Sequence, residues 1–503
     1  MTAMHSIAAN VFSPATVSRG SAWGLVAGAT IAIPVLVAPH IPPMQGFLNQ
    51  ALALFGWGAL LAVLAKALPE RSAPWPTHLK VVLAAFALLL AATLATPVWT
   101  GQPVSLALCA AGFIVAASLA VVAGTTLQQS GAGELAFSAL CVGILVAAMG
   151  NACIAVAQIY APSWLDGYWI APNVGPRAIS NLRQSNHLCT LSLWGIVAVL
   201  WLSECRMLRH GASASVALVL MLGVVLSGSR LGLLGVAALA LWGLSDRRLN
   251  RATRIALLLA PVAYALLWAG TAALASKGLL TFAGEQRFTL AETSAGSRFD
   301  LWPNTLALIR EHPWTGIGVG EFNLAWTLTP FPVRSGELFG HAHNLPLQFA
   351  VEMGLPLAIL VLALLGWAFW AAAKNCASIA ASGQAPSSTR PALVMLTLVL
   401  VHSLLEYPLW YAYFLLPATF MLGLCLPRPN LSEPVAAPAP HAESRTGSIL
   451  RPAALIVMLG AAFSVQDYLR VTPVYVPPPP TVPSPLSERI AAGQRSLLFP
   501  YLA

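Results

Sequence analysis

Residues 339–372 read FGHAHNLPLQFAVEMGLPLAILVLALLGWAFWAA, so a short polar segment with two histidines runs directly into a long apolar stretch. The apolar part, residues 345–372, is longer than the roughly 20 residues that a helix needs to cross the hydrocarbon core of a bilayer. Similar apolar runs recur from Ser21 to Gln466 with short polar breaks between them. This pattern predicts a chain built from membrane-spanning helices.

The composition supports the same conclusion. Of the 503 residues, 58% are hydrophobic and 9% are charged. A soluble globular chain carries roughly 25% charged residues, so this chain must be dissolved in lipid. We therefore predict an all-α polytopic membrane protein with about 12 to 13 transmembrane helices and a long periplasmic loop that contains short helices. The predicted spans are residues 22–40, 46–68, 79–99, 104–125, 135–160, 187–204, 213–229, 231–244, 254–275, 345–372, 391–405, 409–426 and 452–468.

Neither nucleic acid nor a metal ion is an expected ligand. The net charge of +9 comes from basic residues scattered through loops and helix ends, whereas a nucleic-acid-binding domain gathers them on one face. The seven cysteines lie in or beside apolar runs and show no CxxC spacing, so we expect neither a disulfide framework nor a metal site. Membrane lipids are the expected surroundings, and no cofactor is expected.

Charged loops predict how the chain is oriented. Lys and Arg in short loops stay on the cytoplasmic side of a membrane, and the basic segment 246–251 (DRRLNR) is the firmest anchor. With the N-terminus inside, the long loops 161–186 and 276–344 lie on the outer side of the membrane. Loops of this length in a compact domain are usually functional or disordered. Within the second, residues 300–311 are expected to form a helix whose apolar face lies on the membrane.

The chain divides into two parts on this interpretation. Residues 1–468 form a transmembrane domain that includes the periplasmic loop 276–344. Residues 469–503 form a proline-rich periplasmic tail, in which four prolines follow one another from Pro477 to Pro480. Such a run favours an extended polyproline spacer.

The two histidines of the opening stretch differ in their position. A histidine at a membrane boundary is often only a hydrogen-bonding residue, and this simpler interpretation applies to His341. His343 immediately precedes Asn344 and a predicted helix start, where the positive end of the helix dipole disfavours a second positive charge. A neutral imidazole can accept a proton from an attacking hydroxyl. We therefore predict that His343 is a general base.

Arginines on the outer side indicate an anionic ligand. The positive-inside bias makes them unexpected there, although an arginine at a helix end can also simply extend to the interface. In the segment 227–230 (SGSR), small residues leave the guanidinium room to meet a ligand. Guanidinium groups bind phosphate oxygens bidentately, and several of them would hold a diphosphate. The candidates are Arg177, Arg183, Arg230 and Arg298.

Metal-assisted binding of a diphosphate normally needs carboxylates, and the outer loops contain no DxD or ExD pair. We therefore expect arginines in place of a metal.

Glu406 lies in the apolar stretch 401–410 at the outer end of a span, where an ionisable group is costly and is usually functional or paired. Two interpretations stay open, an ion pair with an arginine that fixes helix packing, and a catalytic role. Tyr407 offers a hydroxyl and a ring at the same place.

Six short motifs occur in one order, all in segments predicted to lie on the outer side. They are residues 181–187 (NLRQSNH), 227–230 (SGSR), 297–302 (SRFDLW), 312–314 (HPW), 341–344 (HAHN) and 406–411 (EYPLWY). In these motifs the chain resembles the O-antigen ligase superfamily (Wzy-C type) of bacterial inner-membrane glycosyltransferases. It resembles more closely the branch of PglL-type protein O-oligosaccharyltransferases.

The resemblance implies transfer of a preassembled glycan from undecaprenyl diphosphate to an acceptor hydroxyl in the periplasm, without a nucleotide sugar or a metal. The essential loop histidine of the family matches His343, its glutamine matches Gln184 and its tyrosine matches Tyr407. The arginines with which the family contacts the diphosphate look most like Arg230 and Arg298.

We therefore predict a multi-pass enzyme of the bacterial inner membrane with its active site facing the periplasm. His343 would deprotonate a Ser or Thr hydroxyl of a pilin-like acceptor protein. Three alternatives stay open: a lipopolysaccharide O-antigen ligase that uses lipid A-core as acceptor, an O-antigen polymerase, and a transporter, which should show internal repeats. The predicted substrate-binding residues are Arg177, Arg183, Gln184, Arg230, Arg298, His341, Glu406 and Tyr407.

Overall fold

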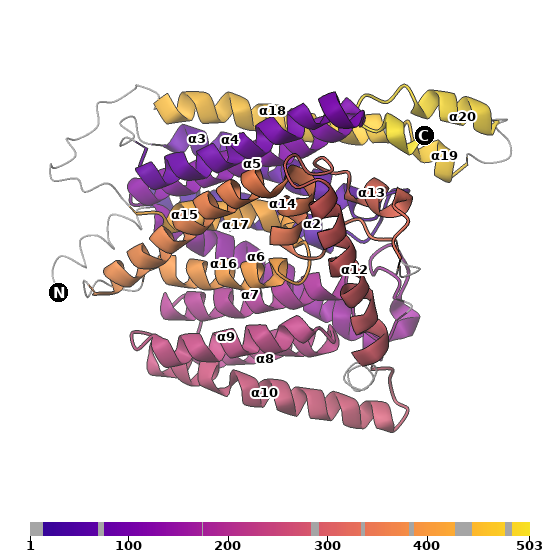
Figure 1. The fold of residues 1–503 in the computed structure, drawn as a ribbon. Coiled ribbons are helices and arrows are strands. Elements are labelled where there is room, and N and C mark those ends of the chain that lie inside the picture. The colour runs from indigo at the N-terminus through magenta and orange to yellow at the C-terminus, as the bar shows by residue number, and fades with distance from the viewer. Residues whose placement is uncertain are drawn as a thin grey trace.

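The computed structural model describes residues 14–68, 75–173, 175–282, 291–332, 338–381, 387–427, 445–477 and 485–503. Within these ranges the regular secondary structure is helical throughout, which confirms the all-α prediction. The long helices lie side by side in one bundle (Figure 1). They are α2 (Pro14–Leu36), α3 (Phe47–Ala67), α4 (Thr77–Thr100), α5 (Val104–Gln129), α6 (Gly133–Tyr160), α7 (Ser185–Glu204), α8 (His210–Leu226), α9 (Arg230–Ser245), α10 (Arg251–Ser276), α15 (Leu355–Ala381), α16 (Thr389–Ser403), α17 (Ala412–Cys425) and α18 (Arg445–Tyr468).

Within the described ranges, eight helices are long and apolar enough to cross a membrane, and five further apolar helices have 10–17 residues. The chain is therefore a multi-pass membrane protein, as predicted. Helix α7 lies at the centre of the bundle and is buried over 94% of its most apolar stretch. Its first turn consequently lies among the ends of neighbouring helices, and this placement positions the site described below.

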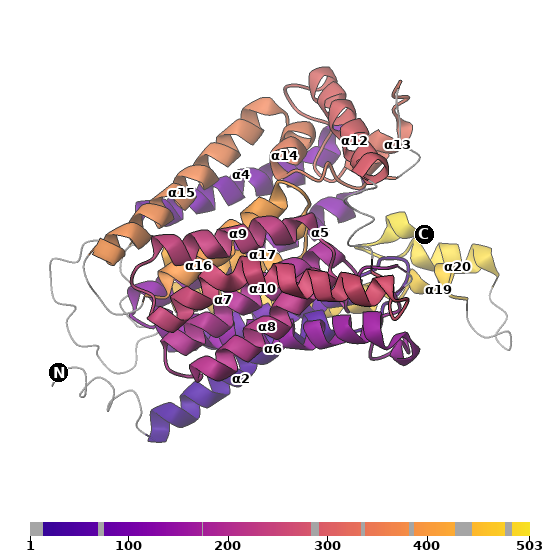
Figure 2. The same ribbon diagram turned by 90° about the horizontal axis from the view of Figure 1, so that it is seen from below.

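Short helices gather beyond one end of the bundle, which we call the α12 end (Figures 1 and 2). Three of them, α12, α13 and α14, come from the loop between α10 and α15. Apart from the bundle helices, the elements within the described residues are η1 (Pro162–Trp164), α12 (Ala291–Glu311), α13 (Phe322–Leu328), α14 (Leu345–Met353), η2 (Pro408–Trp410), α19 (Thr472–Tyr475), α20 (Leu486–Gly493) and η3 (Pro500–Leu502).

The predicted continuous span 345–372 is wrong, because the chain breaks at Gly354 between α14 and α15. Gly354 has a φ of 75°, and a Cβ there would overlap the carbonyl oxygen of Trp314. The segment 313–318 also uses the backbone groups that the break leaves free. Ile317 N–H donates to Val351 O at 2.9 Å, and Leu355 N–H donates to Pro313 O at 2.8 Å. A tertiary contact therefore ends the helix that the apolar pattern would continue.

The predicted helix at 300–311 exists as part of α12, but its apolar face does not lie on the membrane. Leu301, Leu308 and Ile309 are buried, at 0%, 2% and 6% exposure. They pack in a small core with side chains of α13 and α14, which include Phe322 and Val351. The outer loop thus has a hydrophobic core of its own, and this core holds α12 against α14.

The segment predicted as a proline-rich tail is folded where the structure describes it. Side chains of the last turn, including Phe499, pack against Phe47 and Tyr468. The carboxylate of Asp467 accepts hydrogen bonds from Ser496 Oγ at 2.7 Å and from Leu498 N–H at 2.8 Å. Residues 478–484, which include part of the polyproline run, lie outside the described residues.

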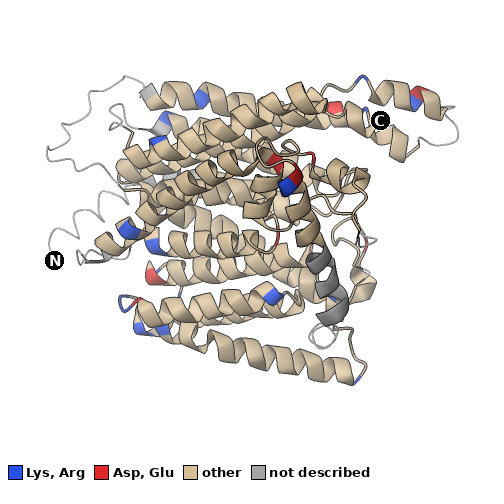
Figure 3. Ribbon diagram, viewed as in Figure 1, with Lys and Arg blue, Asp and Glu red and all other residues tan. Residues whose placement is uncertain are grey.

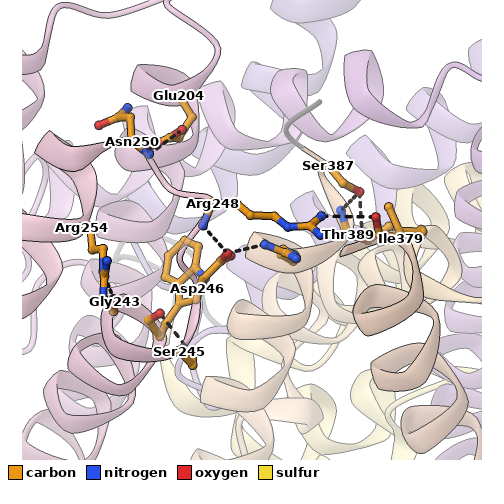
Figure 4. Close-up of polar contacts among 12 residues, drawn as sticks. Glu204, Gly243, Ser245, Asp246, Arg248, Asn250, Arg254, Ile379, Ser387 and Thr389 are labelled. Carbon is orange, nitrogen blue, oxygen red and sulfur yellow. Dashed lines mark hydrogen bonds and ion pairs between the residues drawn. The ribbon is translucent and has the colours of Figure 1, made fainter. Parts of the chain in front are cut away.

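Lys and Arg gather at the end of the bundle opposite α12, which we call the basic end (Figure 3). There, Asp246 forms an ion pair with Arg390, accepts from Arg248 N–H at 3.2 Å and accepts from Trp242 Nε1 at 3.3 Å. Arg248 Nη1 also donates to Ile379 O at 3.4 Å (Figure 4). These contacts join the loop between α9 and α10 to α15 and α16.

We expect Asp246→Ala to destabilise the protein, because it leaves the half-buried guanidinium of Arg390 without its ion-pair partner. The loss should be on the order of 2 kcal/mol in the free energy of unfolding. Thermal unfolding of the detergent-solubilised protein would measure it. Arg247→Ala, at an exposed position in the same loop, serves as the control and should unfold at the wild-type temperature. Equal unfolding temperatures for Asp246→Ala and wild type would contradict this role.

Candidate active site

The site is centred on a contact between His343 and Glu406 at the α12 end. Nδ1 of His343 lies 3.0 Å from Oε2 of Glu406, and the two side chains are 19% and 9% exposed. His343 comes from the loop before α14, and Glu406 from the turn between α16 and η2. Glu406 therefore contacts a histidine in this site, and the interpretation that pairs it with an arginine stays a prediction.

The start of α7 fixes the carboxylate of Glu406 from the other side. Gln184 Nε2 donates to Oε2 of Glu406 at 3.2 Å, and Asn186 Nδ2 donates to Oε1 at 2.9 Å. Both carboxylate oxygens therefore have amide donors, and the direction in which Glu406 faces His343 is set by the most buried helix of the bundle.

Asn186 also connects this pair to the turn before α9. Its Oδ1 accepts from Ser229 Oγ at 2.6 Å and lies 3.5 Å from Arg177 Nη2. Arg177 Nε in turn donates to Ser227 O at 2.9 Å. Gly228 has a φ of 55°, and a Cβ there would lie 3.3 Å from Arg177 Cγ. The arginine side chain therefore lies directly across the SGSR turn, which ends at Arg230.

Aromatic rings form the wall beside the histidines. The ring of His341 lies 4.1 Å from Tyr407 and 5.0 Å from Trp410, centre to centre, and the ring of His343 lies 5.0 Å from Tyr407. Burial lowers the pKa of His341 to about 3, so its imidazole is neutral near pH 7. A small pocket lies between these groups. Its lining consists of His341, His343, Asn344, Leu345, Gln348, Ser403, Glu406, Tyr407, Leu409 and Trp410.

The structure thus brings most of the predicted site residues together, from the loop before α7, the loop before α14 and the turn between α16 and η2. Arg230 is the first residue of α9 and is exposed. Arg183, next to Gln184, donates instead to the carbonyl of Ala38, and burial lowers its pKa. The backbone of Arg298 lies in α12, but its side chain lies outside the described residues.

Three residues with clear places in the site were missing from the predicted set, namely Asn186, Ser229 and Trp410. A signal for Asn186 was present, because a polar amide in the first turn of an otherwise apolar helix needs a partner.

Within the described residues, no group of three or more His, Cys, Asp or Glu side chains could hold a metal ion. The metal-free reaction stays a prediction.

Comparison with known families finds three matches along the chain. Residues 178–202 match the protein glycosylation ligase family, residues 214–362 match the O-antigen ligase family, and residues 391–501 match the C-terminal part of virulence factor membrane-bound polymerases. Each matched region supplies part of the site: Asn186 from the first, His343 from the second and Glu406 from the third.

Two curated relatives come from Acinetobacter baylyi. The general O-oligosaccharyltransferase is 28% identical over 404 residues, which cover 73% of this chain and 68% of the relative. The ComP-specific O-oligosaccharyltransferase is 26% identical over 254 residues, which cover 49% of this chain and 43% of the relative. The motif-based resemblance is confirmed: this membrane glycosyltransferase is similar to the O-antigen ligase family and to bacterial O-oligosaccharyltransferases.

Proposed function

We propose that this protein transfers a preassembled glycan from undecaprenyl diphosphate to a Ser or Thr hydroxyl of a pilin-like acceptor protein. The names of both relatives support O-linked transfer. The observation that carries the proposal is the continuous network from His343 through Glu406 and Asn186 to Arg177 and the SGSR turn. This network supports the proposal because His343, as the base, would lie on the same network as an arginine that could neutralise a diphosphate leaving group.

The basic end of the bundle supports the orientation that we propose. Short basic loops stay in the cytoplasm, and the loops of the basic end include the segment 246–251. With that end inside, the His343–Glu406 pair faces the periplasm of a bacterial inner membrane. A lipid-linked glycan and a periplasmic protein would both reach the site from there.

Proton transfer would begin at His343. An ionised carboxylate only accepts hydrogen bonds, so Nδ1 of His343 carries the hydrogen in its contact with Glu406. The lone pair of Nε2 then takes the proton of the acceptor hydroxyl, whose oxygen attacks the anomeric carbon of the first sugar. The bond from that carbon to the diphosphate oxygen breaks, and this single displacement inverts the anomeric centre. Glu406 stabilises the imidazolium that results.

The departing diphosphate carries negative charge, which arginines would neutralise. Arg177 and Arg230 flank the SGSR turn, and Arg298 on α12 completes the set that we propose. Arg183 contributes through the local field because its guanidinium already donates to Ala38. On the other side of the base, His341 and Tyr407 line the pocket and would contact the sugar or the acceptor.

One alternative acceptor is favoured by a specific finding. The match to the O-antigen ligase family over residues 214–362 fits transfer to lipid A-core equally well, because the base and the diphosphate site would be unchanged. The discriminating experiment expresses the chain in a ligase-deficient host with a lipid-linked glycan and a pilin-type acceptor. Sugar on the pilin supports the proposal, and sugar on lipid A-core alone contradicts it.

We expect His343→Ala to reduce transfer in reconstituted membranes by about 10²- to 10⁴-fold, the usual contribution of a positioned general base. Glu406→Gln should reduce it at least about tenfold, because the imidazolium loses its counter-charge. The mass of the acceptor reports the product. His40→Ala, at an exposed histidine on another loop, is the control. A His343→Ala protein with the wild-type rate would sink the base assignment.

We expect Gly228→Ala to weaken donor binding more than turnover. The new Cβ would lie 3.3 Å from Arg177 Cγ. In addition, residue 228 has a left-handed φ of 55°, which alanine disfavours. Displacing one charge-assisted contact of the donor should raise its KM roughly tenfold. Gly175→Ala is the matched control, since its Cβ finds space. A lower kcat with an unchanged donor KM would argue against a diphosphate site at this turn.

The reaction should proceed at its full rate in excess chelator, because arginines rather than a bound divalent cation neutralise the leaving group. Purified protein treated with EDTA and then assayed with lipid-linked glycan and acceptor measures this. Loss of activity that added Mg²⁺ or Mn²⁺ restores would show that the charge neutralisation is assigned to the wrong groups.

A further inference from the structure

His343 has an unusual backbone conformation. Its φ is 51°, in the left-handed region that residues other than glycine seldom occupy. Such a conformation persists only where the surroundings hold it. The contacts of the residues on either side of His343 therefore decide where its ring points.

The residue before His343, Ala342, is held at both of its backbone polar groups, which belong to two successive peptide units. Ala342 is fully buried, its N–H donates to Gln348 Oε1 at 2.6 Å, and its carbonyl accepts from Trp302 Nε1 at 3.0 Å. After His343, Asn344 Nδ2 donates to Leu404 O at 3.0 Å and Asn344 Oδ1 caps α14 by accepting from Leu347 N–H at 3.0 Å. The left-handed residue is thus fixed from both sides.

We infer that Trp302, together with Gln348, is a positioning residue for the base: the indole N–H holds the Ala342 carbonyl so that His343 faces Glu406. This inference rests on the proposed role of His343. Trp302 is half-buried in α12 and does not line the pocket. It therefore acts through the carbonyl of Ala342, in the peptide that leads into His343, whereas Gln348 holds the N–H of Ala342, one peptide earlier, from the pocket wall.

The place of Trp302 in α12 gives this contact a further meaning. Side chains of the same helix pack into the small core with α13 and α14, and the backbone of Arg298 lies about one turn earlier in α12. Helix α12, which carries the Arg298 proposed to bind the diphosphate, therefore also holds the backbone next to His343 through Trp302. A shift of α12 on donor binding would be passed directly to His343.

Trp302→Phe tests the inference, because phenylalanine keeps an aromatic ring and removes the N–H. Reconstituted full-length protein with lipid-linked glycan and acceptor should show kcat lowered roughly 10- to 100-fold, the scale on which a displacement of about 1 Å slows catalysis. The donor KM should stay at its wild-type value. Trp314→Phe, at an indole that is 77% exposed in the same loop, should leave both constants unchanged.

A double-mutant cycle separates positioning from general damage. If Trp302 acts only through His343, adding Trp302→Phe to His343→Ala changes neither the residual rate nor the rate restored by free imidazole. An equal loss in both backgrounds, or a raised donor KM with unchanged kcat, would overturn the inference. Gln348→Met, which removes the other contact at similar volume, must show the same kcat loss and the same non-additivity if Trp302→Phe does not fold.

The outcome for His343→Ala distinguishes this inference from the proposed function. A wild-type rate in His343→Ala overturns both, because no base would then need positioning. A lost rate in His343→Ala with an unaltered rate in Trp302→Phe overturns the positioning role alone.

Discussion

The candidate active site depends on the carboxylate of Glu406, which lies at the end of an apolar helix bundle. A buried charge is costly unless it is paired and hydrogen-bonded, and Glu406 is only 7% exposed. Gln184 and Asn186 at the start of α7 donate hydrogen bonds to it, and His343 in the loop before α14 contacts it. The contacts that stabilise this charge therefore bring together distant segments of the chain. Asn186 lies 220 residues from Glu406 in the sequence, and His343 lies 63 residues from it. The site exists because that requirement is met.

Two separate hydrophobic cores hold different parts of the site in place. The large core surrounds α7 and fixes Gln184 and Asn186 with little freedom. The small core of α12, α13 and α14 fixes the histidine loop and rests on the α12 end of the bundle. The proposed base, His343, and the SGSR turn are therefore carried by different structural units, and hydrogen bonds through Glu406 and Asn186 join them.

The sequence predicted much of this, and its failures have physical causes. Apolar run length identified the spanning segments, because bilayer thickness imposes it directly. Residue type and position identified His343, and resemblance supplied Gln184 and Tyr407. The break at Gly354 was not predictable, since the segment 313–318 imposes it through tertiary contacts. The contact between Glu406 and His343 was equally hidden, because a contact across 63 residues leaves no local pattern.

The glycines around the break have a consequence for any screen of inactive variants. Side chains at Gly316 and Gly354 would overlap the backbone of Glu352 and of Trp314, and a Cβ at Gly318 would lie 2.7 Å from two threonine methyl groups of α4. None of these glycines lines the pocket. Substitutions at these positions would therefore lower activity by disturbing the packing of the outer loop against the membrane-spanning helices. A ranking of positions by lost activity alone would wrongly assign these glycines to the active site.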